Sequence, residues 1–151
     1  MTRIPLRRYT ARALPLDSQG RVLMLHGFDP HHPSRTYWFT IGGATEGDET
    51  LQEAAVRELR EEVGIVASVD DFVGPLETST VEFRFAEYDI VQDQTFFAVH
   101  VGDAEVSFAH MEDIEKETTL EYRWWSVADL SATTEVIFPA NLAELLRKAG
   151  Q

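Results

Sequence analysis

The stretch GGATEGDETLQEAAVRELREEVGI, residues 42–65, carries the most informative pattern in the chain. Glycine and aspartate crowd its first seven residues, so the backbone there can adopt conformations that are closed to bulkier residues. Thr50, followed three residues later by Glu53, predicts a capping box. The helix is expected to cover residues 51–63 and to end at Gly64, where a left-handed glycine would cap it. The stretch therefore predicts a glycine-rich loop that leads directly into a helix.

One side of this predicted helix is apolar. With about 100° of rotation per residue, Val56, Leu59 and Val63 gather on one side, and Ala55 lies at its margin. This stripe is expected to pack against the rest of the protein.

Three glutamates of the same helix form a separate acidic wedge. Glu58, Glu61 and Glu62 share one face because spacings of three and four residues bring side chains together on a helix. Like charges in one wedge repel, and a cation among them would relieve the repulsion. Carboxylate oxygens are hard ligands of the kind that Mg²⁺ and Mn²⁺ prefer. The wedge therefore indicates a divalent-metal site, and the alternative is an acidic face that is exposed to solvent.

The spacing of the fixed residues in this stretch resembles the Nudix box. Gly43, Glu49 and the run RELREEVGI at residues 57–65 fit that pattern at every fixed position, and Leu59 and Ile65 fill its two bulky aliphatic positions. The resemblance implies a Nudix hydrolase, which cleaves a nucleoside diphosphate linked to another moiety and uses a divalent metal ion. It also implies an α/β fold, the Nudix-like α/β/α sandwich with a mixed β-sheet.

The resemblance assigns roles to the residues of the box. It makes Glu61 and Glu62 the usual metal ligands, and it makes Glu58 either a further ligand or the residue that orients a water molecule. Arg57 is expected to act in catalysis by pairing with a box carboxylate and holding its rotamer. The Gly43 carbonyl is a further candidate metal ligand, because a glycine backbone can approach an ion closely; otherwise Gly43 is a plain turn residue. We expect Mg²⁺ as the ion, with Mn²⁺ as an alternative.

The general base is less defined by the sequence. In enzymes with this box it is sometimes a box glutamate and sometimes a glutamate in a later loop. The later candidates here are Glu112, Glu115 and Glu117, and we favour Glu117 because it is nearest to the following predicted strand. Each of the three could instead be a surface charge, and geometry has to decide.

Aromatic and basic residues are the candidates for substrate binding. Tyr37 and Trp38 border a predicted loop and could stack on a nucleobase or another ring. Phe28 and Tyr88 are weaker candidates of the same kind, and packing in the core is the alternative for all four. Arg12 is the basic candidate for contact with the phosphates of a substrate. It clusters with Arg7 and Arg8 in an otherwise acidic chain, and solvation of a strand edge is the alternative. 

Composition limits the class of protein. The chain has 151 residues, which predicts a single domain over residues 1–151, and its net charge of −13 argues against extensive binding to nucleic acid or to anionic membranes. The absence of cysteine excludes a disulfide framework and a thiolate nucleophile. By resemblance, it also argues against the Nudix relative isopentenyl diphosphate isomerase, which uses a catalytic cysteine. Without an apolar signal core or a membrane-spanning stretch, a cytoplasmic location is expected.

The order of the predicted elements supports the same fold class. Strands are expected at residues 9–16, 21–25, 37–40, 66–73, 81–85, 95–101 and 121–126, with a turn at Gly74-Pro75, a connecting loop at residues 86–93 and a last helix that Pro139 opens. Strands before and after one central helix, followed by a terminal helix, indicate a mixed sheet with helices on both sides.

These observations predict a metal-dependent hydrolase that cleaves a diphosphate linkage in a nucleoside diphosphate derivative. A nucleoside triphosphate, a nucleotide sugar and ADP-ribose are the candidate substrates, and a small-molecule nucleotide is the expected partner. Two alternatives remain: a nucleotide-binding sensor module without turnover, and an RNA 5′-end pyrophosphohydrolase. The oligomeric state stays open, with a homodimer among the options.

Overall fold

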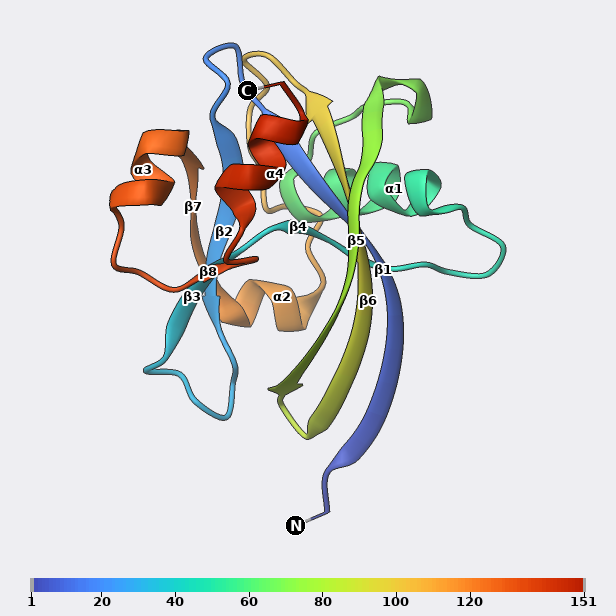
Figure 1. Ribbon diagram of the computed structural model, residues 1–151. Coiled ribbons are helices and arrows are strands. Elements are labelled where there is room, and N and C mark those ends of the chain that lie inside the picture. The colour runs from blue at the N-terminus through green and yellow to red at the C-terminus, as the bar shows by residue number, and fades with distance from the viewer. Residues whose placement is uncertain (1, 151) are drawn as a thin grey trace.

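A computed structural model describes residues 2–150 of the chain (Figure 1). Along the chain the elements are β1 (Ile4–Leu16), β2 (Val22–Phe28), β3 (Thr36–Phe39), β4 (Ile41–Ala44), α1 (Leu51–Val63), the 3₁₀ helix η1 (Val69–Asp71), β5 (Phe72–Phe85), β6 (Tyr88–His100), α2 (Asp113–Thr118), β7 (Thr119–Trp125), α3 (Val127–Ala132), β8 (Ile137–Phe138) and α4 (Leu142–Lys148). No helix in this range combines the length and the apolar character that crossing a bilayer requires.

The long strand β1 organises the sheet. One edge of β1 pairs in parallel with β6 along its whole length, and β5 continues the sheet as the antiparallel partner of β6. The other edge of β1 pairs with β4, and with β2 only where Leu16 faces Val22. Strand β2 in turn carries β3 and β7, and β8 runs parallel to β3. The sheet therefore consists of two halves that meet at one end of β1 and β2.

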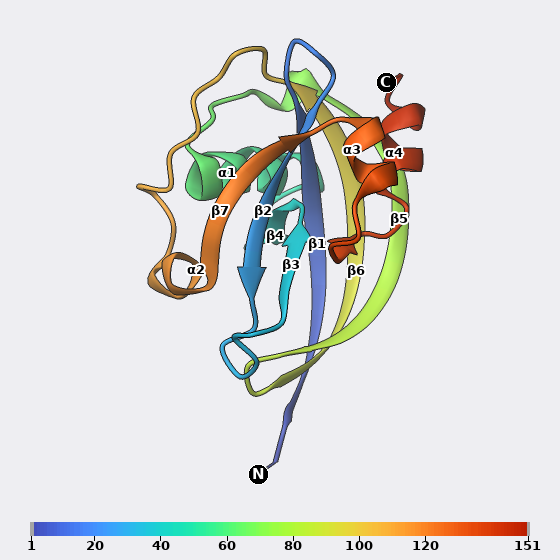
Figure 2. The same cartoon turned by 90° about the vertical axis from the view of Figure 1, so that its left-hand side faces the viewer.

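Helices cover both faces of this sheet, as expected for the α/β/α sandwich. Helix α1 lies on one side and helices α3 and α4 lie on the other, as the two perpendicular views show (Figures 1 and 2). Neighbouring residues of β1 point into separate cores, as the period of a strand requires. Ala13 packs in the core that contains Leu59 of α1, whereas Leu14 packs in the core that contains Leu145 of α4. The predicted mixed sheet with helices on both sides is confirmed.

Helix α1 begins and ends at the predicted residues. The Glu53 amide donates to Thr50 Oγ1 at 3.1 Å, and the Thr50 amide donates to Glu53 Oε1 at 2.9 Å, so the capping box is complete. Gly64 ends the helix with a φ of 71°, the left-handed conformation that glycine adopts without strain.

The buried stripe of α1 is rotated from the predicted one. Ala54 and Ala55 are fully buried beside Ala11 of β1, whereas Val56 is only half-buried. Small side chains at these positions let the helix approach β1 closely, and this approach turns Val56 away from the core.

Two predictions around the β5–β6 hairpin are wrong. The strand expected at residues 66–73 is mostly a loop and η1, because the Asp71 carboxylate accepts from the Ser68 amide at 2.8 Å and closes a turn. The loop expected at residues 86–93 is mostly the start of β6. Its acidic residues are stabilised by arginines from the N-terminal segment, since Arg3 contacts Asp89 at 2.5 Å and Arg7 contacts Asp93 at 2.9 Å.

Other local expectations need smaller corrections. The turn expected at Gly74-Pro75 is an irregularity in the register of β5, between Val73 and Glu77. Part of the expected glycine loop forms the short strand β4, because Ile41–Ala44 pairs with β1.

Candidate functional site

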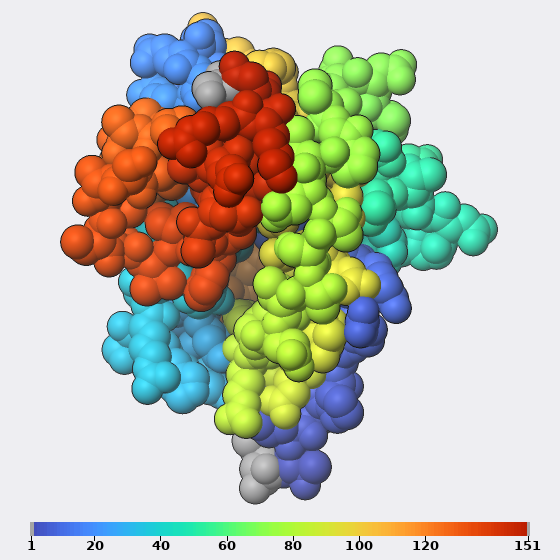
Figure 3. Space-filling view, viewed as in Figure 1, coloured from blue at the N-terminus to red at the C-terminus, as the bar shows by residue number. Residues whose placement is uncertain are grey.

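A cavity of about 750 Å³ lies between the two halves of the sheet. The space-filling view shows the face hollowed between β5 and the part of the chain that holds α3, α4 and β8 (Figure 3). The lining includes residues of three kinds: carboxylates (Glu46, Glu58, Glu61, Glu62, Glu82, Glu112 and Glu115), arginines (Arg8, Arg12 and Arg84) and aromatic rings (Phe28, Tyr37, Phe39, Phe83, Phe85 and Phe138). Strongly acidic and aromatic surfaces thus meet in one cavity.

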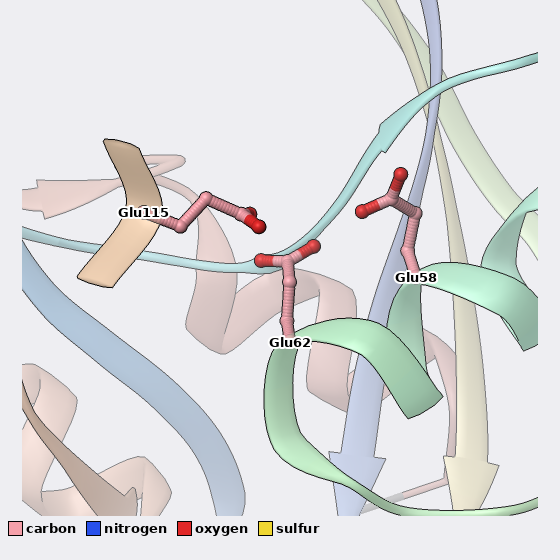
Figure 4. Close-up of side chains that lie close together, drawn as sticks. All are labelled: Glu58, Glu62 and Glu115. Carbon is pink, nitrogen blue, oxygen red and sulfur yellow. The ribbon is translucent and has the colours of Figure 1, made fainter. Parts of the chain in front are cut away.

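Three carboxylates converge in this cavity. Glu58 and Glu62 come from α1 and Glu115 comes from α2, and their side chains point toward one another (Figure 4). One oxygen from each residue lies within 4.8 Å of the other two. Glu62 is only 2% exposed, and its Oε2 accepts from the Gly42 amide at 2.9 Å. Burial raises the pKa of Glu62 well above its usual range, and the neighbouring Glu58 carboxylate adds to the rise.

The orientation of α2 places the later glutamates differently relative to the cavity. Glu115 belongs to the cluster, and Glu112 also lines the cavity. Glu117, the favoured base candidate, is exposed and does not line it. The two side chains diverge because residues two apart on a helix do not share a face. Burial raises the pKa of Glu115, although the Glu112 amide opposes this rise by donating to Glu115 Oε1 at 3.1 Å.

Arg57 connects α1 to the loop that precedes it through hydrogen bonds. Its Nε and Nη2 donate to the two carboxylate oxygens of Glu49 at 2.7 and 2.9 Å, and its Nη1 donates to Glu58 Oε1 at 2.7 Å. The guanidinium also bonds the Ala44 carbonyl at 2.9 Å. The hydrogen bond with Glu49 is the main cause that raises the pKa of Arg57, and burial opposes it. Arg57 therefore stays charged and fixes one member of the carboxylate cluster.

Glu61 and Gly43 lie beside the cluster. The Glu61 carboxylate lines the cavity and accepts from Arg57 at 3.2 Å, but the group of three that converges in residues 2–150 does not include it. Gly43 also lines the cavity, and a Cβ at this position would lie 2.7 Å from Glu58 Oε1. Only glycine therefore allows Glu58 to approach β4 this closely.

The arginines of β1 divide between the cavity and the surface. Arg12 is buried in the lining, where its Nε donates to Thr40 Oγ1 at 3.0 Å and its Nη2 donates to the Thr40 carbonyl. Burial lowers the pKa of Arg12, and the Glu62 charge opposes this effect. Arg8 also lines the cavity, whereas Arg7 points to the other side of β1 and pairs with Asp93.

The two aromatic candidates of β3 point in opposite directions. Tyr37 lines the cavity, with its ring centroid 5.5 Å from that of Phe138. Burial raises the pKa of Tyr37 to about 12, and the charge of Asp29 adds to the rise. Trp38 is only 3% exposed and does not line the cavity; it stacks on His26 at 4.4 Å and packs in the core. The alternation of a strand separates these neighbours, so Tyr37 is the one of the pair that faces the cavity.

Sequence reasoning missed several lining residues. Val81, Phe83 and Phe138 contribute apolar surface, and Gln92 and Gln94 contribute two amides. The spacing of the two glutamines places both on one face of a strand, but this signal was hidden because Gln92 was expected to lie in the loop at residues 86–93.

Comparison with known proteins identifies the family. The family model described as NUDIX domain matches residues 6–146. The chain is 30% identical over 108 residues to isopentenyl-diphosphate Delta-isomerase of Photobacterium profundum, covering 66% of this chain and 53% of the relative. It is 53% identical over 36 residues to CTP pyrophosphohydrolase of Escherichia coli, covering 24% and 27%. These alignments thus span about half or less of the relatives' own lengths.

A solved structure agrees with the fold. The NUDIX domain of Shewanella oneidensis NrtR, complexed with ADP ribose, superposes with a TM-score of 0.66 at 19% identity, covering 97% of this chain and 90% of that one. Because the family model also matches most of the chain, this chain belongs to the Nudix family.

Proposed function

We propose that the protein is a metal-dependent hydrolase that cleaves a diphosphate linkage in a nucleoside diphosphate derivative. The observation that carries this proposal is the convergence of Glu58, Glu62 and Glu115 in a cavity that also contains Arg8 and Arg12. Such a site combines negative ligands for a cation with positive groups for phosphates.

The residues fit a divalent cation. Glu62 is buried next to Glu58, and this arrangement is unfavourable unless a proton or a cation lies between the carboxylates. All the donors are oxygens, which suits Mg²⁺ and also Mn²⁺. A bound ion of this kind polarises a phosphoryl oxygen and lowers the pKa of a coordinated water. Glu58 and Glu62, with Glu61 and the Gly43 carbonyl at the border, are the proposed ligands.

Arg57 and Glu115 have separate roles in the proposed catalysis. Arg57 holds Glu58 through a 2.7 Å hydrogen bond, so this carboxylate is positioned before substrate arrives. Glu115 takes the place of Glu117 as the proposed general base. Its raised pKa brings it closer to neutral pH, where a base accepts a proton from water most effectively.

Binding of the substrate uses the other lining residues. Arg12 and Arg8 supply positive charge for the phosphates inside a chain whose net charge is −13. Tyr37 supplies a neutral ring for stacking on the base or on another ring of the substrate. The names of the relatives mention CTP and ADP ribose, which agrees with nucleotides as the substrate class. Isomerase chemistry is not proposed, because the chain contains no cysteine.

The test is nucleotide hydrolysis with Mg²⁺ by the wild type and by Glu62→Gln. We expect hydrolysis of at least one nucleoside triphosphate, nucleotide sugar or ADP-ribose by the wild type, and a loss of about 10²–10⁴-fold in kcat for Glu62→Gln. Glu105→Gln is the matched control, because Glu105 is exposed and lies outside this cavity. Equal rates for wild type and Glu62→Gln would contradict the proposal, and binding without turnover would indicate a sensor module.

A further inference from the structure

Two buried amides line the cavity and are not used by the proposed chemistry. Gln92 is 5% exposed and Gln94 is 8% exposed, and both belong to β6. The Gln92 amide nitrogen donates to the Gln94 side-chain oxygen at 3.1 Å. This bond leaves the Gln92 oxygen and the Gln94 amide nitrogen for other partners. Within residues 2–150, the buried Gln92 oxygen has no hydrogen-bond partner.

The sheet places this pair between charged and apolar neighbours. The parallel register sets Gln92 beside Arg8 of β1, and the antiparallel register sets it beside Val81 of β5. Arg8, Val81 and both glutamines line the same cavity as Tyr37. A ligand whose phosphates approach the arginines can therefore place an attached ring near the two amides.

The unpartnered oxygen points to a ligand with a hydrogen-bond donor. A buried carbonyl without a donor is unfavourable, and a suitable ligand group would remove this penalty. The last torsion of a glutamine side chain has a broad energy profile, so the Gln92 amide can turn toward the cavity, and its 3.1 Å bond to Gln94 is the interaction that it gives up. With the Gln94 amide beside it, the pair offers one acceptor next to one donor. This is the complement of a base edge on which an amino group adjoins a ring nitrogen.

We propose that Gln92 and Gln94 select a nucleobase with an exocyclic amino group beside an unprotonated ring nitrogen, as in adenine and cytosine. Gln92 Oε1 accepts from the amino group, and Gln94 Nε2 donates to the ring nitrogen. The inference rests on the proposed function, because it names the substrate class of the same cavity. Turning both amides over would reverse the pattern and would favour guanine or uracil instead.

Two pairs of nucleotides test this assignment. ATP is compared with purine riboside triphosphate, and CTP with 2-pyrimidinone riboside triphosphate, since each pair differs only in the amino group. For at least one pair, we expect the wild type to prefer the amino base by about 10–100-fold in kcat/KM, because its loss leaves the Gln92 oxygen unpaired. In Gln92→Met, which keeps the length of the side chain without the amide, the preference should fall to about twofold or less.

The controls separate recognition from folding. Gln52→Met makes the same change on α1 outside the cavity and should keep the wild-type preference. Gln94→Met is the second variant and should weaken the preference in the same direction. Wild-type rates that are equal within both pairs, a preference for GTP or UTP over ATP and CTP, or an unchanged preference in Gln92→Met would each overturn the inference. The comparison of wild-type rates within the two nucleotide pairs tests the inference even if a variant fails to fold.

Equilibrium binding distinguishes this inference from the proposed function. Dissociation constants of the same four nucleotides, measured by titration calorimetry with Mg²⁺, report recognition without turnover. Amino-base preference in binding without any hydrolysis would support the inference and contradict the hydrolase. Hydrolysis without amino-base preference would support the hydrolase and overturn the inference. If none of the four nucleotides binds, the inference is also overturned.

Discussion

The two walls of the cavity are built in different ways. On the wall from β4 and α1, charged hydrogen bonds fix the side chains, and Arg57 alone binds Glu49, Glu58 and Glu61. On the wall from β5 and β6, apolar side chains such as Val81 alternate with polar ones, and the amides of Gln92 and Gln94 bond each other. The first wall fixes the positions of charges, whereas the second fixes a shape and a few hydrogen-bonding atoms. Under the proposed function, reaction chemistry and substrate choice would therefore depend on different elements and could be perturbed separately.

Removal of divalent ions should have the largest effect on activity. It acts on the wall from β4 and α1, which we call the charged wall. Dialysis against EDTA should abolish nucleotide hydrolysis, because the proposed ligands Glu58 and Glu62 then have no cation to hold, and added Mg²⁺ should restore it. The far-ultraviolet circular dichroism spectrum should not change, because the cores on both faces of the sheet are apolar. Hydrolysis that persists in EDTA would contradict the role given to the charged wall.

Arg57→Lys should weaken the same wall without removing its charge. We expect kcat to fall by about 10–100-fold, because a lysine ammonium cannot bind Glu49 and Glu58 in the fork geometry of a guanidinium. Steady-state kinetics on the best substrate measures the change. Arg35→Lys, at an exposed loop position outside the cavity, is the control and should retain wild-type kinetics. An unchanged kcat in Arg57→Lys would show that the hydrogen-bonded network does not position Glu58.

Substitution of Tyr37, on β3, tests substrate binding apart from the charged wall. Because burial raises the pKa of Tyr37 to about 12, its phenol stays neutral over the usual assay range, and Tyr37→Phe should leave the pH profile unchanged. Tyr37→Ala removes the ring and should raise KM about tenfold with a smaller change in kcat. Tyr9→Ala is the matched control, since Tyr9 is exposed on β1 and does not line the cavity. A fall in kcat alone would place Tyr37 with the chemical step instead.

The smallest expected effect is a gain in the stability of the metal-free protein in the variant Glu62→Gln. Burial raises the pKa of Glu62, so the folded state keeps a proton that the unfolded state loses as the pH rises above the usual glutamate range. The metal-free wild type therefore loses stability as the pH rises until it passes the raised pKa of Glu62. In EDTA, Glu62→Gln should have a higher Tm than the wild type at pH 8, by about 2–4 °C for each kcal/mol gained in the free energy of unfolding. At pH 4 the two proteins should have nearly the same Tm. A lower Tm at pH 8 would show that the Gly42 amide stabilises the ionised carboxylate instead.

The sequence was sufficient to predict the structure where residues close together along the chain determine it. The capping box of Thr50 and Glu53 and the left-handed Gly64 lie within α1 or directly beside it, so the bounds of this helix could be predicted exactly as observed. The convergence of Glu58 and Glu62 follows from helical spacing alone.

The sequence was insufficient where partners are distant along the chain. The start of β6 has the composition of a loop, and it becomes a strand because it pairs with β1, where Asp89 and Asp93 meet Arg3 and Arg7 from 86 positions earlier in the chain. The choice of Glu115 over Glu117 depends on the orientation of α2 against the cavity. The strand at the start of β6 and the orientation of α2 both depend on tertiary contacts, and no local sequence pattern predicts them.

The junction between the two half-sheets has a consequence for redesign. Strands β1 and β2 share a single paired position, Leu16 with Val22, so the cavity widens away from one fixed corner. Within residues 2–150, strand β5 is an edge strand that pairs only with β6, and it contributes no carboxylate to the converging cluster. Under the proposed function, libraries that vary Val81 and Phe83 should therefore change which nucleoside is accepted while the acidic cluster keeps its arrangement, so β5 is the place to begin engineering new selectivity.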